Sequence, residues 1–223
     1  MNLNVEKILI IGLGMIGSSI ALASKSKGIK VYGFDKSNNS IKEALEKNII
    51  DSKVESILDI NSKDFVKKVD LIIVAVPPKQ TLDVLNDLKD IWNTDVTITD
   101  TSSVKNHIKL NGASNIVLSH PIAGSDQSGI SAADGDLFKN KKNVLCDPFN
   151  SKKGHFEKVD NFWKNALQMR TSLMSVTEHD LIFAMTSHLP HLVSYALIDS
   201  IRLSNHDVDD NAGGGLKEFL RLS

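Results

Sequence analysis

A glycine triplet near the N-terminus restricts the possible folds more than any other feature of the sequence. Gly12, Gly14 and Gly17 form the pattern G-x-G-x-x-G, which directly follows an apolar run and opens a helical pattern. In a strand–turn–helix unit such glycines permit the tight turn, let the backbone approach a pyrophosphate and let the helix pack closely on the strand. The triplet therefore predicts a dinucleotide site at a helix N-terminus, with Met15 and Ile16 in the first turn of that helix.

An acidic residue after the second apolar run indicates which dinucleotide binds. Asp35 ends the segment VYGFD, 18 residues after Gly17. A carboxylate at this position accepts hydrogen bonds from the ribose hydroxyls of NAD and repels the 2′-phosphate of NADP. NAD is therefore the expected cofactor, and NADP is disfavoured but not excluded, since Lys36 could tolerate some phosphate. The alternative is that Asp35 is a surface acid in a strand–helix turn.

A proline pair follows the apolar run Leu71–Val76. The loop after this strand lies over the cofactor in a dinucleotide-binding sheet, so Val76 and Pro77 are expected to border the cofactor. Pro77 and Pro78 would stiffen the loop. A rigid turn without a ligand role is the alternative for either proline.

Short apolar runs alternate with amphipathic segments along residues 1–176. The runs are Lys7–Ile11, Lys30–Phe34, Leu71–Val76, Val96–Thr99, Asn115–Leu118, Asn143–Leu145 and Arg170–Val176. Several are apolar throughout, which suits strands buried on both faces of a parallel sheet. Helices are expected over Ile41–Lys47 with Ser40 as N-cap, over Thr81–Ile91 and over Phe156–Leu167. The alternation predicts an α/β fold, a doubly wound Rossmann-type dinucleotide-binding domain over residues 1–176.

The pattern changes to all-helical at Thr177 and stays so to Leu203. Thr177 and Asp180 resemble a capping box at the start of this helix. Gly213–Gly215 then predicts a flexible loop. A single long helix with a short tail cannot bury its own apolar face. We therefore expect residues 177–223 to be the start of an all-α substrate and dimerisation domain that is truncated, or that another chain completes.

Charge and composition exclude several classes of protein. The formal net charge is −1, which offers no basic excess for nucleic acid. The N-terminal segment MNLNVEKILIIGLG has no leader pattern, and its apolar run is too short to span a bilayer, which needs about 20 residues. Cys146 is the single cysteine and can form no intrachain disulfide, which fits a reduced setting. A cytoplasmic protein without nucleic-acid or membrane partners is expected.

Two polar segments follow strands at the edge where a doubly wound sheet binds its ligands. One is DTSSVK at 100–105 and the other is SHPIAGSDQSG at 119–129. His120 is expected at the carboxyl end of its strand, where an imidazole can take a proton from a hydroxyl as hydride leaves. A loop histidine bonded to backbone is the alternative for His120 alone.

Five segments together resemble the prephenate/arogenate dehydrogenase family of tyrosine biosynthesis. They are DTSSVK, SHPIAGSDQSG, EHD at 178–180, SHLPH at 187–191 and GGGLKEFLR at 213–221, in the family's order and spread over essentially the whole chain. The resemblance identifies His120 as the catalytic histidine that bonds to the substrate's ring hydroxyl, and Ser103 as a serine bonded to the same hydroxyl. One departure from the family pattern is Asp126, where the family usually has Glu.

The resemblance also implies a set of substrate-binding residues. His191 corresponds to a substrate-binding position, Arg221 to the arginine that binds the ring carboxylate, and Gly214 to a loop glycine near the substrate. His188 lies three residues before His191, on the same helix face, and is a further candidate, although a core or capping role fits it equally. Two histidines at this spacing could bind a metal, but a third ligand is lacking, so no metal site is predicted. Arg221 alone would be a surface arginine.

The implied reaction is NAD-dependent oxidative decarboxylation of prephenate to 4-hydroxyphenylpyruvate, or of arogenate to L-tyrosine. The family forms homodimers and continues well past the arginine, whereas this chain ends two residues after Arg221. Weak dimerisation and poor turnover are therefore expected, and a catalytically weak NAD-binding fragment is a further alternative. A β-hydroxyacid dehydrogenase or an imine reductase would have the same first domain, but usually a catalytic lysine in the helical domain or no SHPIAG loop.

Overall fold

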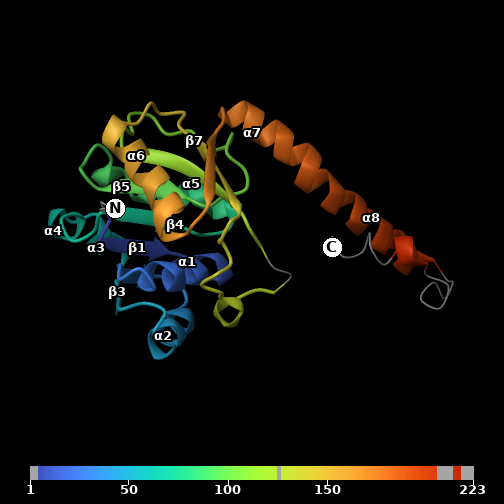
Figure 1. The fold of residues 1–223 in the computed structure, drawn as a ribbon, viewed down its shortest axis with the longest axis horizontal. Coiled ribbons are helices and arrows are strands. Elements are labelled where there is room, and N and C mark those ends of the chain that lie inside the picture. The colour runs from blue at the N-terminus through green and yellow to red at the C-terminus, as the bar shows by residue number, and fades with distance from the viewer. Residues whose placement is uncertain (1–4, 125–126, 205–212, 217–223) are drawn as a thin grey trace. The chain divides into compact units, whose positions relative to one another are not determined.

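The computed structural model describes residues 5–124, 127–204 and 213–216. The chain divides into two compact units, Met1–Val176 and Thr177–Ser223. The first unit is built on a sheet with helices on both faces, and the second consists of helix (Figure 1).

The sheet of the first unit has the strand order β3-β2-β1-β4-β5-β6-β7-β8 within the described residues. The strands are β1 Lys7–Ile11, β2 Lys30–Phe34, β3 Ser52–Lys53, β4 Leu71–Val74, β5 Thr97–Asp100, β6 Ile116–Ile122, β7 Lys142–Cys146 and β8 Arg170–Leu173. The pairs from β3 across to β6 are parallel, β7 is antiparallel to β6, and β8 is parallel to β7. The predicted Rossmann-type α/β sheet is thereby confirmed, and β7 and β8 run against the other described strands of the sheet.

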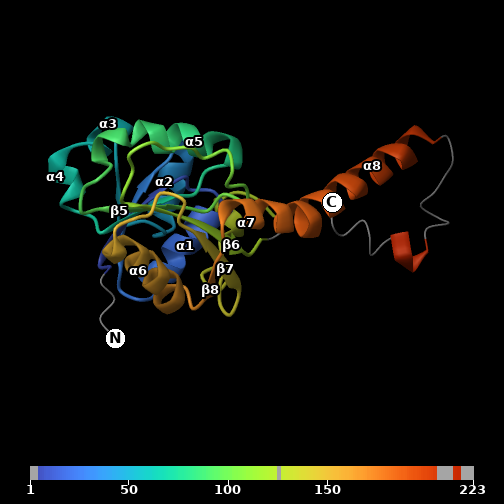
Figure 2. The same cartoon turned by 90° about the horizontal axis from the view of Figure 1, so that it is seen from above.

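Helices cover both faces of the sheet. They are α1 Met15–Lys25, α2 Asn38–Glu46, α3 Ile57–Ile60, α4 Lys63–Val66, α5 Pro78–Asp87 and α6 Lys153–Asn161, and α6 continues as the π-helical turn Phe162–Ala166. Figure 2 shows α5 on one face and α1 and α6 on the other. The core between α1, α6 and the sheet contains the fully buried rings of Phe138, Phe162 and Trp163, which meet edge to face.

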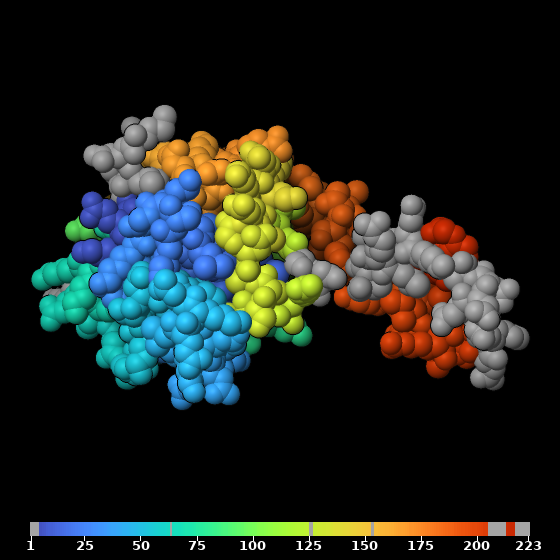
Figure 3. Space-filling view, turned by 60° about the horizontal axis from the view of Figure 1, so that its bottom comes forward, coloured from blue at the N-terminus to red at the C-terminus, as the bar shows by residue number. Residues whose placement is uncertain are grey.

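The connection between β6 and β7 lies against α1 and α2 (Figure 3). It includes the short 3-10 helix Ile130–Ala132. Hydrogen bonds hold it there: Asp134 N donates to Ser19 Oγ over 3.0 Å, Ser131 Oγ donates to Glu43 Oε1 over 3.2 Å, and Lys47 Nζ donates to Ser131 Oγ over 3.4 Å. The long connection thus packs beside the glycine-triplet helix.

Several predicted boundaries require correction. Helix α2 begins at Asn38, so Ser37 is the N-cap, and its Oγ accepts a hydrogen bond from the N–H of Ser40 over 3.2 Å. Helix α5 begins at Pro78 rather than Thr81, because a proline needs no hydrogen-bond partner for its nitrogen in a first turn. Strand β6 continues four residues past Leu118 to Ile122, because β7 pairs with it there.

The second unit consists of α7 Val176–Phe183, the π-helical turn Ala184–His188 and α8 Leu189–Leu203. The predicted all-helical pattern is confirmed, and the irregular turn ends two residues before Pro190, which lacks the N–H of a regular helix. Thr177 is not an N-cap, because the helix already begins at Val176. Residues 214–216 have helical backbone, and Leu216 N donates to Gly213 O, so the prediction of a loop at the glycines is wrong there.

The long helix of the second unit leaves apolar side chains exposed. The exposed set is Leu181, Met185, Leu189, Leu192, Val193, Tyr195 and Leu203. Val176–Leu203 is long and apolar enough to cross a membrane by length and composition alone, a criterion that helices of soluble proteins also meet. The expectation that this helix cannot bury its own apolar face is confirmed.

Candidate functional site

The glycine triplet forms a tight turn between β1 and α1. Gly12 has φ +98°, and a Cβ atom there would lie 2.5 Å from the Ala75 carbonyl oxygen. A Cβ atom on Gly17 would lie 1.9 Å from the Gly12 carbonyl oxygen. A Cβ atom on Gly14, in contrast, would meet nothing within 4 Å. Gly12 and Gly17 are thus required by packing, whereas Gly14 leaves open space beside the helix N-terminus.

The N-terminus of α1 is suited to an anion. Gly14 is the N-cap and supplies no side-chain hydrogen bond, and the first turn contains no acidic residue. The first turn includes Met15 and Ile16, whose backbone N–H groups have no partners within the helix itself. The open space at Gly14 therefore lies beside backbone N–H donors, and a pyrophosphate could accept hydrogen bonds from them.

Asp35 lies directly beside this turn. Its Oδ2 accepts a hydrogen bond from Leu13 N over 2.7 Å, and its Oδ1 accepts one from Ser37 N over 2.8 Å. The carboxylate therefore connects the glycine turn with the start of α2. Each carboxylate oxygen can accept a second hydrogen bond, as the hydroxyls of a ribose require.

A pocket of about 250 Å³ joins these elements. Its lining includes Gly12, Gly14, Asp35, Val76 and Pro77, so the structure brings these predicted cofactor residues together. Gln80 and Val84 also line it, and sequence reasoning missed both. They lie one turn apart on α5, which begins at Pro78. The predicted helix, which began at Thr81, left Gln80 outside it.

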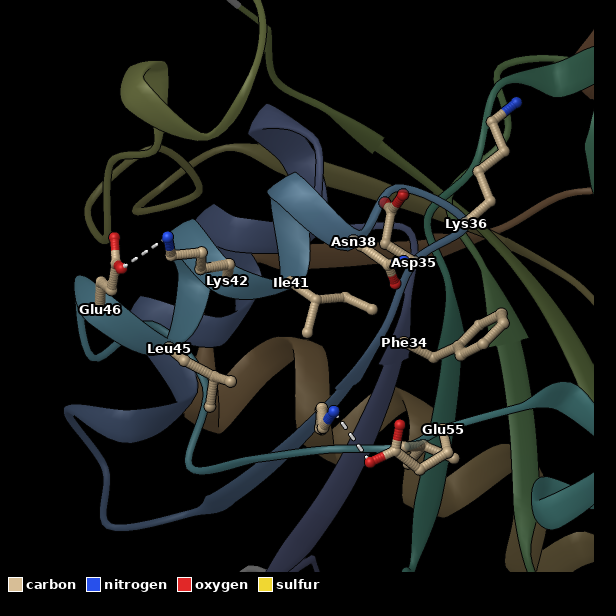
Figure 4. A pocket seen from close by; sticks show the side chains of 11 residues that line it. Phe34, Asp35, Lys36, Asn38, Ile41, Lys42, Leu45, Glu46 and Glu55 are labelled. Carbon is tan, nitrogen blue, oxygen red and sulfur yellow. Dashed lines mark ion pairs between the residues drawn. The ribbon is translucent and has the colours of Figure 1, made fainter.

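A larger cavity of about 780 Å³ adjoins this pocket along α2. The two share Phe34, Asp35 and Lys36. Figure 4 shows Ile41 and Leu45 of α2 along one side of this cavity. The open Gly14 position, the uncapped helix and the acceptor Asp35 together fit a dinucleotide whose ribose hydroxyls are free.

His120 lies within β6, half-buried, where its strand pairs with Val144 of β7. The prediction that His120 follows the strand is therefore wrong for β6 itself. The pairing of β6 with β5 ends at Val117, however, so His120 lies beyond the last pair with its parallel neighbour. Ser103 is half-buried in the loop that follows β5.

One carboxylate links the segments that carry these two residues. Asp100, the last residue of β5, accepts hydrogen bonds from the N–H groups of Ser102 and Ser119, each over 3.0 Å. Ser102 and Ser119 directly precede Ser103 and His120. The segments that carry the two predicted catalytic residues are therefore linked through Asp100 at one edge of the sheet.

The predicted substrate-binding residues belong to the second unit. The Nδ1–H of exposed His191 donates to the Ser187 carbonyl oxygen over 2.7 Å, because a carbonyl can only accept. In the Nδ1–H tautomer, Nε2 is an acceptor. His188 is half-buried in the π-helical turn, and Gly214 is exposed. Arg221 and Asp126 lie outside the described residues.

A buried histidine of the EHD segment received no role from sequence reasoning. His179 is fully buried, its Nδ1 lies 2.7 Å from Asp180 Oδ1, and its ring stacks 4.7 Å from that of Phe183. The EHD segment belongs to the family resemblance, but the position of a histidine on a helix does not reveal its burial. In the described part of the chain, no group of three or more His, Cys, Asp and Glu residues could hold a metal ion.

Comparison with known proteins identifies the family. The model of the prephenate dehydrogenase nucleotide-binding domain matches residues 20–169, and that of the prephenate dehydrogenase dimerization domain matches residues 175–223. Prephenate dehydrogenase of Bacillus subtilis is 32% identical over 100% of this chain and 62% of its own length. Cyclohexadienyl dehydrogenase of Zymomonas mobilis is 33% identical over 88% of this chain and 67% of its own length.

A solved structure extends this likeness to three dimensions. Prephenate dehydrogenase from A. aeolicus, in complex with hydroxyphenyl propionate and NAD+, matches with a TM-score of 0.85 and 31% identity, over 100% of this chain and 79% of that one. The chain spans about 62% of the length of the Bacillus relative. Two family models in succession and relatives above 30% identity lead to one conclusion: the chain belongs to the prephenate dehydrogenase family.

Proposed function

We propose that this chain is an NAD-dependent dehydrogenase that oxidises and decarboxylates prephenate to 4-hydroxyphenylpyruvate, a step of tyrosine biosynthesis. One observation carries the proposal. The Asp100 carboxylate bonds to the residues preceding Ser103 and His120, at the sheet edge that also receives the glycine turn after β1. A hydroxyl donor and an imidazole acceptor are thereby available beside a dinucleotide site, as an alcohol oxidation requires.

The cofactor part of the proposal is supported by the pocket beside β1. Asp35 has acceptor capacity beyond its two backbone bonds, and Gly14 leaves room for a pyrophosphate. NAD, when bound, supplies the hydride acceptor. A negative carboxylate at Asp35 disfavours the extra phosphate of NADP.

The proposed chemistry gives each residue one task. His120 accepts the proton of the ring hydroxyl while the carbon that bears it loses a hydride, and Ser103 orients that hydroxyl. The ring carboxylate then leaves as carbon dioxide, and its bonding electrons make the ring aromatic. The proton returns to the ring oxygen, which completes the phenol without a net gain or loss of protons. The chain's contribution is orientation and proton transfer.

The substrate-binding part rests on the family resemblance of the second unit. We assign the ring carboxylate to Arg221 and further substrate contacts to His191, Gly214 and His188. The Nδ1–H bond of His191 to Ser187 leaves Nε2 as an acceptor. An acceptor suits the ammonium group of arogenate, and the name of the Zymomonas relative covers cyclohexadienyl substrates as a class. Arogenate is therefore the second candidate substrate.

The deciding experiment follows NADH formation with prephenate and with arogenate, for the chain as it stands and for His120→Asn. Turnover that falls by about 10³-fold in His120→Asn, while NAD still binds, supports the reaction and names the substrate. Clear NAD binding without turnover on either substrate contradicts the proposed reaction. The chain would then be a nucleotide-binding member of the family.

We further propose that a second copy of the chain covers the exposed apolar side of α7 and α8. Leu181, Met185, Leu189 and Leu192 follow one another at spacings of four, four and three residues, which places them along one stripe of a helix. The family model that matches this region is a dimerization domain. A homodimer in the cytoplasm accounts for this apolar helix without a membrane.

A further inference from the structure

A lysine with no exposed surface lies at the edge of the sheet that carries His120. Lys105 follows β5 by five residues, and both its side chain and that of Asp100 are 0% exposed. Its Nζ donates to Asp100 Oδ1 over 2.8 Å, to Asp100 Oδ2 over 2.6 Å and to the Ser119 carbonyl oxygen over 2.5 Å. An ammonium group has three protons, so these acceptors can engage all of them.

The residue before His120 is held at each of its polar groups. The N–H of Ser119 donates to Asp100, and its carbonyl accepts from Lys105. Its hydroxyl shares a hydrogen bond of 2.7 Å with Thr99 Oγ1 and accepts one of 3.0 Å from Trp163 Nε1. The backbone N–H, the carbonyl and the hydroxyl of Ser119 are therefore all engaged in hydrogen bonds.

The ion pair replaces strand pairing where β5 ends. Strands β5 and β6 pair at Ile98 with Ile116 and at Thr99 with Val117, and no pair follows. The N–H and carbonyl of Ser119 would otherwise face the end of β5 without partners. Asp100 supplies the acceptor and Lys105 the donor that a further strand residue would have given.

The energetic cost of this arrangement suggests that it serves geometry. Removing two charges from water is expensive, and a buried pair is often no more stabilising than apolar side chains of the same volume. Stability alone therefore does not require a lysine and an aspartate here. Fixed hydrogen-bond directions are what this pair offers and an apolar pair lacks.

We infer that Lys105, through Asp100 and Ser119, is a positioning residue that sets the orientation of His120 relative to Ser103. The expected fall in kcat rests on the proposed function. The expected change in the orientation of His120 does not. Lys105 acts on the backbone of Ser119 and on the carboxylate that also holds Ser102 N. It therefore aligns the proton acceptor and the hydroxyl donor in one unit.

The test uses the paired variant Asp100→Asn with Lys105→Met in the full chain. The pair of substitutions removes both charges at similar volume, so that neither charge is left buried alone. The matched control is Lys25→Met, which breaks the 2.8 Å pair of Lys25 with Asp51 beside β2. Four quantities are measured: the dissociation constant of NAD, kcat, KM for the substrate, and the imidazole resonances of His120 in 15N-histidine-labelled protein, assigned with His120→Asn.

The expected result is a fall in kcat of about 100-fold in the paired variant, as for a misplaced reacting group. KM and NAD affinity should change by less than about threefold, and the His120 resonances should shift or broaden. Lys25→Met should leave all of these quantities at the wild-type values. A paired variant that binds NAD and keeps either its kcat or its His120 resonances unchanged would overturn the inference.

Two further outcomes are distinguished by the same samples. If the wild type turns over neither substrate, the proposed function fails, and the His120 resonances alone decide the inference. If the paired variant does not fold, Asp100→Glu takes its place, because it keeps both charges but moves the carboxylate relative to the N–H groups of Ser102 and Ser119. Unchanged His120 resonances in that variant would equally overturn the inference.

Discussion

The backbone at Gly17 lies so close to the Gly12 carbonyl oxygen that a Cβ atom on Gly17 would come within 1.9 Å of it. The Cβ position on Gly14, two residues beyond Gly12, is open to at least 4 Å. The same triplet therefore combines a glycine needed for packing with one that leaves open space beside the N-terminus of α1.

Substitution of these two glycines should separate folding from cofactor binding. Gly17→Ala should lower the free energy of unfolding by about 2 kcal/mol, because the turn must move to admit the methyl group. Gly14→Ala should leave it within about 0.5 kcal/mol but raise the NAD dissociation constant about tenfold. Urea denaturation and a fluorescence titration with NAD measure the two effects. Unchanged NAD affinity in Gly14→Ala would mean that the pyrophosphate does not lie at this position.

Asp35 should determine the preference for NAD over NADP. Asp35→Asn removes the negative charge and places an amide group against one of the two N–H donors, Leu13 or Ser37. We expect NAD affinity to fall about tenfold, because charge-assisted hydrogen bonds are lost, and the ratio of NADP to NAD affinity to rise. The control is Asp83→Asn, an equal change of charge at an exposed position of α5. An identical affinity ratio in the two variants would contradict the assignment.

His155 should make the stability of the fold depend on pH. Burial lowers the pKa of His155, as do Lys158 and Lys152, while Asp95 raises it, and the net pKa lies below 6.5. Near pH 6.5, the His155 side chain therefore binds a proton in the unfolded chain more readily than in the folded chain. Stability should be fully present above that pH and should decline as the pH falls below it.

The variant His155→Asn tests this pH dependence. Asparagine can retain a hydrogen bond to Thr97, whose Oγ1 lies 2.8 Å from His155 Nδ1, but it does not titrate. Free energies of unfolding from urea titrations at pH 7.5 and pH 5.5 should differ more for the wild type than for the variant. Equal differences for the two proteins would show that His155 does not contribute.

The apolar stripe of α7 and α8 should control self-association. Sedimentation should show concentration-dependent dimers, and Met185→Glu with Leu192→Glu should shift them to monomers, because a charge in an apolar interface remains uncompensated. Leu58→Glu, at an exposed leucine of α3, should leave the association unchanged. If the wild type is monomeric at every concentration, the proposal that a second copy of the chain covers this helix is wrong.

The sequence predicted best those elements whose residues share one environment. β1 and β2 match the predicted runs Lys7–Ile11 and Lys30–Phe34 residue for residue. The residues of β1 after Lys7 are buried on both faces of the sheet, as in the middle of a parallel sheet. The end of β6 was missed because Ser119, His120 and Pro121 are polar or lack an N–H, and such residues usually mark the end of a strand.

The remaining errors concern partners that are distant along the chain. Nothing local in the segment Lys142–Cys146 reveals that β7 runs against β6. Lys105 was visible as part of a motif, but its complete burial depends on Asp100 and Ser119 together. The roles of Ser103, His120 and His191 stay predictions, as does the assignment of the two units to cofactor and substrate domains.

The π-helical turn Ala184–His188 has a consequence for deletions in this helix. A turn of this kind contains about one residue more than a regular helical turn. Loss of one residue there would leave an ordinary α-helix, and His191 would keep roughly the same side of the helix relative to the residues before the turn. The same loss in the regular part of α8 would rotate everything beyond it by about 100°. A one-residue deletion at the π-helical turn should therefore preserve the faces of the helix, whereas a deletion further along α8 would exchange the side chains that the rest of the helix presents on a given face.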